Sequence, residues 1–278
     1  MLSTSSSGEE ENQEPLKEIR DRSFLGSGLA RPRLADCALV AKSGSVLTLR
    51  TVSGVAAMQY TQVLAAQLGA SVGAAHSISY QLWLTVGLLA DAVAIAVQPL
   101  LAEALALEDA PRCRAVLLRA IILAVIVALC NSLILAGAGT ALRKFFTSDP
   151  ATLVEAAAIW PIALRSQVFT CAAFVCDGML FAACDFSFCA IAMIIASAIS
   201  IATQLALAPR LGLRGIWYGL ELMMLLRFLT GAARIASRTG PWRYAFLRRP
   251  LPPPDDNSND DDKEPSMTAN PPEEEIGR

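Results

Sequence analysis

Six apolar runs alternate with short polar segments along this chain. The runs cover residues 46–68, 78–107, 115–142, 156–184, 188–208 and 215–236. Each is close to or longer than the roughly 20 residues that cross about 30 Å of hydrocarbon as a helix. With 54% hydrophobic and 17% charged residues, the 278-residue chain is also too apolar for an ordinary soluble domain. The pattern predicts an all-α integral membrane protein, a six-transmembrane-helix bundle.

The two ends of the chain differ from the middle. Residues 1–30 are polar and acidic, which predicts a disordered segment without a cleavable targeting sequence, and residues 31–44 mix basic and apolar positions, as an interfacial amphipathic linker does. The predicted transmembrane lobe spans 45–240. Residues 241–278 begin with Trp and Tyr among arginines, which predicts an interfacial anchor, and continue into a disordered acidic and proline-rich tail.

The basic residues near the spans divide unequally between the two sides of the predicted bundle. One side carries Arg31, Arg33, Lys42, Arg112, Arg114, Arg119, Arg234, Arg238, Arg243, Arg248 and Arg249, and the other carries Arg143, Lys144, Arg210 and Arg214. The side richer in basic residues normally faces the cytoplasm. The distribution therefore predicts that both termini lie on the cytoplasmic side, or on the stromal side in a plastid.

The second run carries one acid, Asp91, near its middle. A charged Asp at the centre of a membrane helix costs about 2.5 to 3.5 kcal/mol, so such an acid normally faces a protein interior or a water-filled path. Gln98 lies two helical turns later on the same face, and Gln81 lies ten residues earlier at a less exact phase. This stripe predicts a cation or substrate pathway; the alternative is that Asp91 hydrogen-bonds a neighbouring helix.

The fourth run carries a second polar stripe, in which Asp177 follows Thr170 by two turns. Arg165 lies twelve residues before Asp177, about 18 Å along one helix, so the two cannot pair with each other. We expect both residues in the pathway, with a partnership of Asp177 with Arg165 or Arg227 of another helix as the alternative for the acid.

Three further polar sites lie in or beside the spans. Gln59 and Gln62 share one face of the first run and could line a cavity or hydrogen-bond across helices. In the sixth run, Glu221 and Arg227 are on opposing sides of the helix, so each needs a different partner, and we expect Arg227 to snorkel to the interface. His76 at the start of the second run is expected to be an ordinary hydrogen-bonded residue.

The remaining chemistry is sparse. The seven cysteines include no C-x-x-C pair and the chain has a single histidine, so neither a zinc site nor a cofactor is predicted. The motifs H-E-x-x-H and G-x-S-x-G do not occur, which argues against an intramembrane enzyme. Nothing in the composition indicates a nucleic-acid partner.

Five separated segments resemble one family in sequence order. They are LRTVSGVAA at 49–57, AAHSISYQLWLTVGLLADAVAIAVQPLLAE at 74–103, FFTSDPATL at 145–153, VCDGMLFAACDF at 175–186 and GLRGIWYGL at 212–220. Together they resemble the MATE (multidrug and toxic compound extrusion) transporters, in particular the plant DETOXIFICATION and DinF-like branch. The resemblance corresponds to helices seven to twelve, the C-terminal half of a complete member.

The resemblance implies a secondary antiporter that expels small organic solutes in exchange for H⁺ or Na⁺, here as a lobe that would pair with a missing N-terminal lobe or another transporter chain in the lipid membrane. Asp91 matches the Asp of the DinF-like LLADAVAIAVQ motif. Gln59 and Gln62 stand in the helix that bears an acid in some members, and Thr170 stands where other members have an acid in the tenth helix. A second reading is a non-transporting fragment that associates with full-length relatives, and plastid-located relatives imply a plastid envelope as a possible location.

Overall fold

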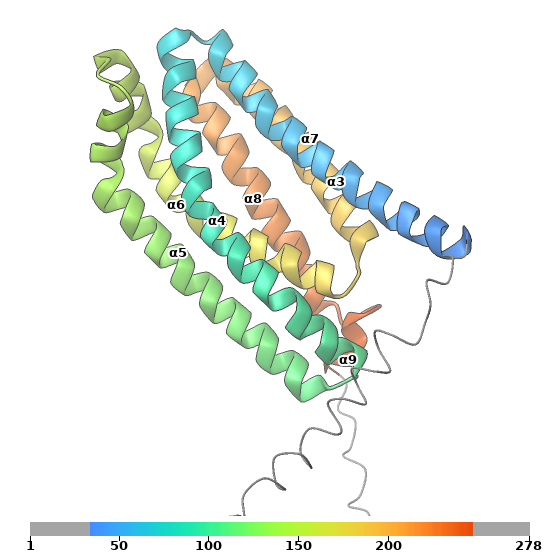
Figure 1. Ribbon diagram of the computed structural model, residues 1–278. Helices are drawn as coiled ribbons and strands as arrows, with labels where there is room; N and C mark the ends of the chain where they lie inside the picture. The colour runs from blue at the N-terminus through green and yellow to red at the C-terminus, as the bar shows by residue number, and fades with distance from the viewer. Residues whose placement is uncertain (1–33, 247–278) are drawn as a thin grey trace, which may run out of the picture.

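The computed structural model describes residues 34–246, and every regular element in that range is an α-helix. The six long helices are α3 (Leu34–Gln67), α4 (Ala70–Ala106), α5 (Ala110–Phe146), α6 (Pro150–Ala182), α7 (Phe186–Leu211) and α8 (Leu213–Ala236), followed by the short α9 (Trp242–Phe246). They run up and down as one bundle (Figure 1). The predicted six-helix bundle is confirmed.

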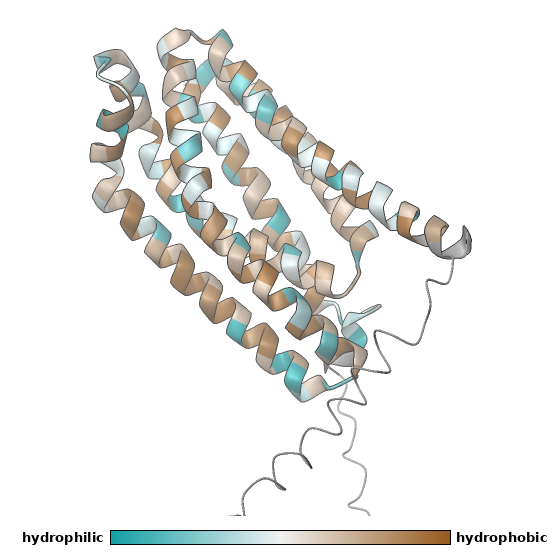
Figure 2. Ribbon diagram, in the orientation of Figure 1, coloured by the Kyte–Doolittle hydropathy of each residue, from teal (hydrophilic) through white to brown (hydrophobic). Residues whose placement is uncertain are grey.

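The central helix is α6, which packs against α4, α5 and α8, while α3 lies against α7 on one side of the bundle. Helices α4 to α8 are long and apolar enough to cross a membrane. Helix α3 matches them in length but not in apolarity, because it carries Lys42, Arg50 and several Ser, Thr and Gln residues. Figure 2 shows this mixture of hydrophilic and hydrophobic positions along α3. The polarity of α3 indicates that part of its surface does not face hydrocarbon.

Short connections with strong capping signals separate the helices. Asp109 caps α5 by accepting a hydrogen bond from the backbone amide of Arg112 at 3.0 Å. Asp149 caps α6 in the same way, accepting from the backbone amide of Thr152 at 2.9 Å. Both helices have a proline in the first turn. Between α7 and α8 the chain turns through a single residue, Gly212, whose φ of 56° favours glycine. These local signals fix the antiparallel order of the helices.

All six long helices begin before the predicted runs, because helix geometry starts in the polar turns that precede the apolar residues, whereas α3, α4 and α6 end slightly before the predicted boundaries. The clearest difference concerns residues 34–44, predicted as a separate interfacial linker: they form the first turns of α3, without a break before the predicted first span. Of the predicted anchor and tail at 241–278, the structure describes only the part up to 246, which includes α9. The predictions for 1–30 lie outside the described residues.

Close approach between α4 and α6 positions the polar residues of the bundle. A Cβ atom added to Gly178 would lie 2.7 Å from the backbone oxygen of Ala94, so only glycine permits this packing.

Two apolar core clusters fill the bundle. Trp83 on α4 and Trp217 on α8 belong to one cluster and lie edge to face, with ring centroids 6.2 Å apart. Trp242 of α9 is fully buried in the second cluster, at the other end of the bundle.

Candidate functional site

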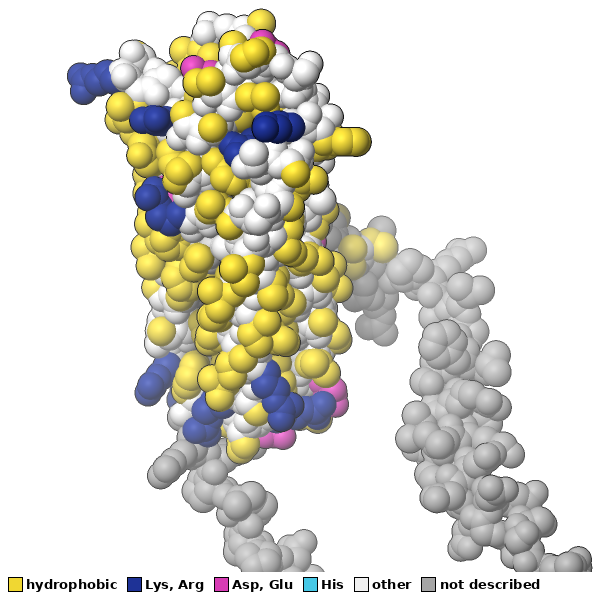
Figure 3. Space-filling model, turned by 90° about the vertical axis from the view of Figure 1, so that its left-hand side faces the viewer, with side chains coloured by type: hydrophobic (Ala, Val, Ile, Leu, Met, Phe, Trp, Pro, Cys, Tyr) yellow, Lys and Arg dark blue, Asp and Glu magenta, His cyan; other side chains and the backbone are white. Residues whose placement is uncertain are grey.

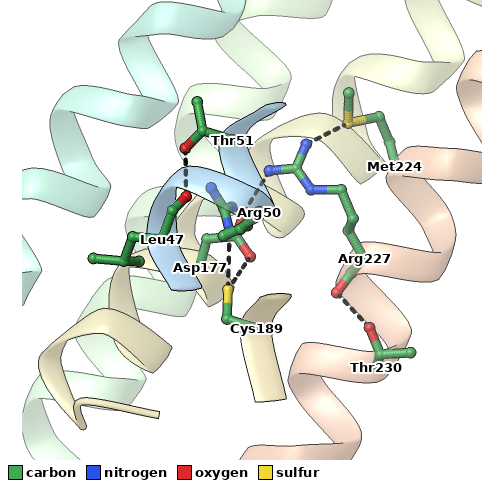
Figure 4. Close-up of polar contacts among 8 residues, drawn as sticks. All are labelled: Leu47, Arg50, Thr51, Asp177, Cys189, Met224, Arg227 and Thr230. Atoms are coloured by element: carbon green, nitrogen blue, oxygen red, sulfur yellow. Dashed lines mark hydrogen bonds and ion pairs between the residues drawn. The ribbon is translucent and has the colours of Figure 1, made fainter. Parts of the chain in front are cut away.

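One buried carboxylate, Asp177 of α6, is shared by two arginines from other helices. Its Oδ2 atom accepts hydrogen bonds from the Nη2 atoms of Arg50 on α3 and of Arg227 on α8 (Figure 4). Cys189 of α7 completes the group, since its Sγ lies 3.1 Å from Nε of Arg50 and 3.7 Å from Oδ1 of Asp177. Four helices therefore meet at this carboxylate.

The cluster carries an uncompensated positive charge, because two guanidinium groups face a single buried carboxylate. Arg227 is only 6% exposed, and its Nε has no hydrogen-bond partner among the described residues. Its Nη1 lies 3.2 Å from Sδ of Met224, a weak acceptor, and its guanidinium lies 5.2 Å from the ring centroid of Phe174. The arginines thus retain hydrogen-bonding capacity that an anionic group could use.

A polar cavity of about 150 Å³ adjoins this cluster on the side of α4. Asp91 and Gln98 line it from α4, opposite Asp177 and the two arginines, so the predicted stripe of α4 and the acid of α6 face one cavity. Asp91 is exposed and joins none of the five ion pairs formed between described residues. The complete lining is Arg50, Asp91, Ala94, Gln98, Phe174, Asp177, Gly178, Phe181 and Arg227.

The other predicted pathway residues do not line this cavity. Gln59 and Gln81 are exposed on α3 and α4, and the amide of Gln62 donates to Oγ of Ser77 on α4. Thr170 is buried and donates to the backbone oxygen of Ser166 at 2.8 Å. Arg165 forms a two-bond ion pair with Glu221 of α8, at 2.5 and 2.6 Å. A role for these five residues elsewhere in the pathway stays a prediction.

The expectation that Arg227 snorkels to the interface is wrong. Its guanidinium is buried and paired with Asp177, because an acid of α6 lies within reach and pairing avoids leaving either charge alone in a low-dielectric interior. The structure thus bears out the alternative reading of Asp177 as a partner of Arg227. The inference that Glu221 and Arg227 need different partners is also correct. Glu221 pairs with Arg165 and Arg227 pairs with Asp177, and both of these partners lie on α6.

Arg50 is the cluster residue that sequence reasoning missed. It lies in the first predicted span and was counted neither as a basic residue near a span end nor as a site residue. The available signal was the energetic cost of Arg50 itself: an arginine inside an apolar run needs a buried acid, and Asp177 was one of the acids predicted inside the spans.

A second buried polar network lies nearer the α3–α4 connection. His76 is fully buried, with Nε2 3.1 Å from Oγ1 of Thr61 and its ring stacked on Tyr80. Close by, Nε1 of Trp83 donates to Oγ of Ser166 at 2.8 Å. His76 is hydrogen-bonded as expected, but inside the bundle. The contact between His76 and Thr61 joins α4 to α3, and the bond from Trp83 to Ser166 joins α4 to α6.

Among residues 34–246, no group of three or more His, Cys, Asp or Glu side chains is placed to hold a metal ion. All seven cysteines lie in this range as free thiols. The prediction that the protein needs neither metal nor cofactor remains a prediction.

Comparison with known proteins assigns the chain to a family. The model of the MatE family matches residues 54–205, which include Asp91, Asp177 and Cys189. The chain belongs to the MatE family. Two relatives from Arabidopsis thaliana are Protein DETOXIFICATION 43, 36% identical over 203 residues, and Protein DETOXIFICATION 44, chloroplastic, 37% identical over 202 residues. Each alignment covers 73% of this chain and 39% of the relative, so this MatE chain spans about two fifths of the length of these relatives.

Solved structures agree with this family fold. The outward-facing conformation of a multidrug resistance MATE family transporter superposes with a TM-score of 0.65 at 16% identity, over 73% of this chain and 46% of that chain. A MATE protein in the bent conformation gives a TM-score of 0.63 at 17% identity, over 70% and 44% of the two chains. The MatE bundle described above therefore has the fold of one half of these transporters.

Proposed function

We propose that this chain is the C-terminal lobe of a MATE-type secondary antiporter, which exports small organic solutes in exchange for H⁺ or Na⁺. The observation that carries the proposal is the polar cavity, in which Asp91, Gln98, Asp177 and two arginines converge inside a bundle of apolar helices. Intramembrane ionisable groups around a cavity are typical of ion and substrate pathways.

In this mechanism Asp91 is the group that takes the coupling cation. Asp177 already accepts from two guanidinium groups, whereas Asp91 faces the cavity without an ion pair to a described residue. Binding of H⁺ or Na⁺ would neutralise Asp91 and remove a cost of several kcal/mol for burying its charge. The cation would therefore favour the arrangement of lobes in which Asp91 is shielded from water, as alternating access requires.

The transported solute is proposed to carry an anionic group. Two guanidinium groups face one buried carboxylate, and Nε of Arg227 is unused among the described residues. Arginine binds carboxylates through parallel N–H bonds, so a solute with a carboxylate or phenolate would gain charge-assisted bonds here. Around the cavity as a whole Asp91 and Asp177 balance the two arginines in formal charge, so the preference for an anionic group comes from the guanidinium N–H donors.

The proposed location is a membrane of the plastid envelope, with both termini on the cytoplasmic or stromal side. The support is that one of the relatives named above is called chloroplastic, and that the end of the bundle with the α4–α5 connection and α9 carries more basic residues than the opposite end.

An efflux assay tests the role of Asp91. Vesicles containing the full chain, with and without a co-expressed full-length DETOXIFICATION relative, are loaded with a fluorescent carboxylate, and efflux is followed after an H⁺ or Na⁺ gradient is imposed. Asp91→Asn should abolish the dependence of efflux on the gradient, because the amide cannot exchange charge with the coupling cation. Glu155→Gln, which neutralises an acid of α6 outside the cavity, is the matched control and should keep gradient-driven efflux. Unchanged coupling in Asp91→Asn would remove Asp91 from the mechanism.

A second candidate function is that of a non-transporting fragment that associates with full-length transporters. It is motivated by the alignment, which covers only 39% of the relatives' length. Co-purification with a full-length relative, together with no efflux by the chain alone and slower efflux by the complex, would favour this candidate over the antiporter lobe.

A further inference from the structure

A long groove crosses the face of the bundle formed by α5, α6 and α8. Two adjoining hollows of about 240 and 450 Å³ share Ile121, Cys176, Met179 and Phe228, so they form one continuous groove, here called the α5–α8 groove. Its inner part is lined by Ile121, Ala124, Val125, Ala128, Leu129, Val168, Phe169, Ala172, Val175, Cys176, Met179 and Phe228. Its outer part adds Arg114, Leu117, Leu118, Ala232, Ile235, Ala236 and Phe246.

This face of the molecule is suited to hydrocarbon. Helix α5 exposes Leu118, Ile122, Leu129 and Leu133, each more than half or nearly half accessible. Figure 3 views the bundle from the side on which α5 lies in Figure 1: hydrophobic side chains cover the middle, and basic side chains gather toward the ends. In a membrane the molecules next to this face are lipids, so the inner groove is positioned to take an acyl chain.

Two arginines stand at the outer end of the groove. Arg114 lines it directly, and only its Nε is engaged, with the backbone oxygen of Ala110 at 3.2 Å. The guanidinium of Arg238 lies 5.2 Å from the ring centroid of Phe246, another lining residue. Both arginines are exposed, and neither joins the five ion pairs between described residues, whereas nearby Arg112 and Arg234 are paired with Glu103 and Asp185.

From this arrangement we infer that the α5–α8 groove binds one anionic phospholipid. An acyl chain lies in the inner groove, and the phosphate at the basic end of the bundle accepts hydrogen bonds from Arg114 and Arg238. Apolar walls alone would not select among membrane lipids, but two guanidinium groups that have no carboxylate partner among residues 34–246 select a headgroup with net negative charge. This site is separate from the polar cavity of Asp91 and Asp177, and the inference does not depend on the proposed transport function.

Native mass spectrometry of the full chain in detergent tests the inference. The protein is mixed with phosphatidylglycerol or with phosphatidylcholine of the same acyl composition, and the lipid-bound fraction is measured against lipid concentration. Phosphatidylglycerol should bind more tightly, and Arg114→Gln and Arg238→Gln should each weaken its binding about fivefold, the effect expected for one basic residue at an anionic headgroup. Arg119→Gln is the matched control, because this arginine of α5 lines a different hollow, between α4 and α5.

A second variant tests the acyl-chain part of the site. Ala172→Phe places a ring in the inner groove at a half-buried position and should lower phosphatidylglycerol binding while leaving the arginines in place. Equal binding of the two lipids to the wild-type protein would overturn the inference. Unchanged phosphatidylglycerol binding in the two arginine variants would also overturn it. Unchanged binding in Ala172→Phe would overturn it too, because the inner groove would then hold no acyl chain.

Discussion

At the scale of single residues, the polar groups inside the apolar helices are explained by partners on other helices. Asp177 is held by Arg50 and Arg227, and Glu221 is held by Arg165. Each of these charges would be costly alone in a low-dielectric interior, and each pair removes much of that cost. Asp91 differs because it faces a cavity and joins no ion pair between described residues, which is why the proposed mechanism assigns the coupling cation to it.

The Asp177 cluster predicts a large loss of stability when its acid is neutralised. Asp177→Asn leaves two guanidinium groups without their carboxylate, and breaking a buried pair in this way costs about 3–5 kcal/mol. The measurement is the thermal unfolding midpoint of the purified chain in detergent. Glu103→Gln breaks the exposed pair with Arg112 and should cost less than about 1 kcal/mol. Equal midpoints for the two variants would contradict the buried cluster.

The cap of α6 predicts a pH dependence outside the membrane-spanning segments. Hydrogen bonds from the hydroxyl and the backbone amide of Thr152 hold the pKa of Asp149 below its usual value. A depressed pKa in the folded state means that the stabilisation is complete above the unfolded-state pKa, near pH 4, and is lost as the pH falls through the folded-state value.

We therefore expect Asp149→Ala to lower the unfolding midpoint by a few degrees at pH 7, with a difference that is constant between pH 5 and 8. The difference should shrink as the pH falls below about 4, where the wild-type carboxylate also loses its charge. Ser148→Ala, one residue earlier, should leave the midpoint unchanged at every pH. A gap between wild type and Asp149→Ala that persists at pH 2 would show that the cap does not act through the ionised carboxylate.

At the scale of helices, the apolar runs predicted the number and order of the long elements but not how closely they approach. Helices α4 and α6 meet at Gly178, and this contact brings Asp91 and Gln98 of α4 to the same cavity as Asp177. The glycine is thus the element-level feature on which the candidate site depends.

Gly178→Ala tests this contact. The added methyl group would lie 2.7 Å from the backbone oxygen of Ala94, so α4 must move away, at a cost of about 1–3 kcal/mol typical of overpacking. The control is Gly137→Ala in α5, where an added Cβ meets no atom within 4 Å; there the loss of glycine should be neutral or stabilising by up to about 1 kcal/mol. Thermal unfolding of both variants decides the matter, and a Gly178→Ala midpoint equal to that of Gly137→Ala would contradict the close packing.

At the scale of the whole molecule, the helices form one bundle whose two ends differ in charge. In the described part of the chain the end with α9 holds Arg112, Arg114, Arg119, Arg234, Arg238 and Arg243, and the opposite end holds Arg143, Lys144, Arg210 and Arg214. From this asymmetry we predict that the α9 end faces the cytoplasm or stroma.

Cysteine labelling checks the orientation. Cys37, Cys130 and Cys184 are the exposed natural thiols and are first replaced by serine. In that background Ser148→Cys, at the α5–α6 connection, should react with a membrane-impermeant maleimide added to the outside of intact cells that carry the protein in their plasma membrane. Ser237→Cys, after α8, should react only once the membrane is permeabilised. The reverse pattern would place the α9 end outside.

The sequence by itself determined that this is a multi-helix membrane bundle, since helix number, order, turns and the stripe of Asp91 and Gln98 all follow from local hydropathy, capping residues and helical phase. The family followed from the resemblance of five separated segments and not from these patterns. Only the tertiary structure decided which polar residues meet. Local pattern does not encode distances between helices, so Arg50 was missed, Arg227 was expected at the interface, and Gln59, Gln62, Gln81, Thr170 and Arg165 turned out to lie away from the cavity. The physical reason is that a buried charge is placed by its partner, and the partners of Asp177 lie 127 and 50 residues away along the chain.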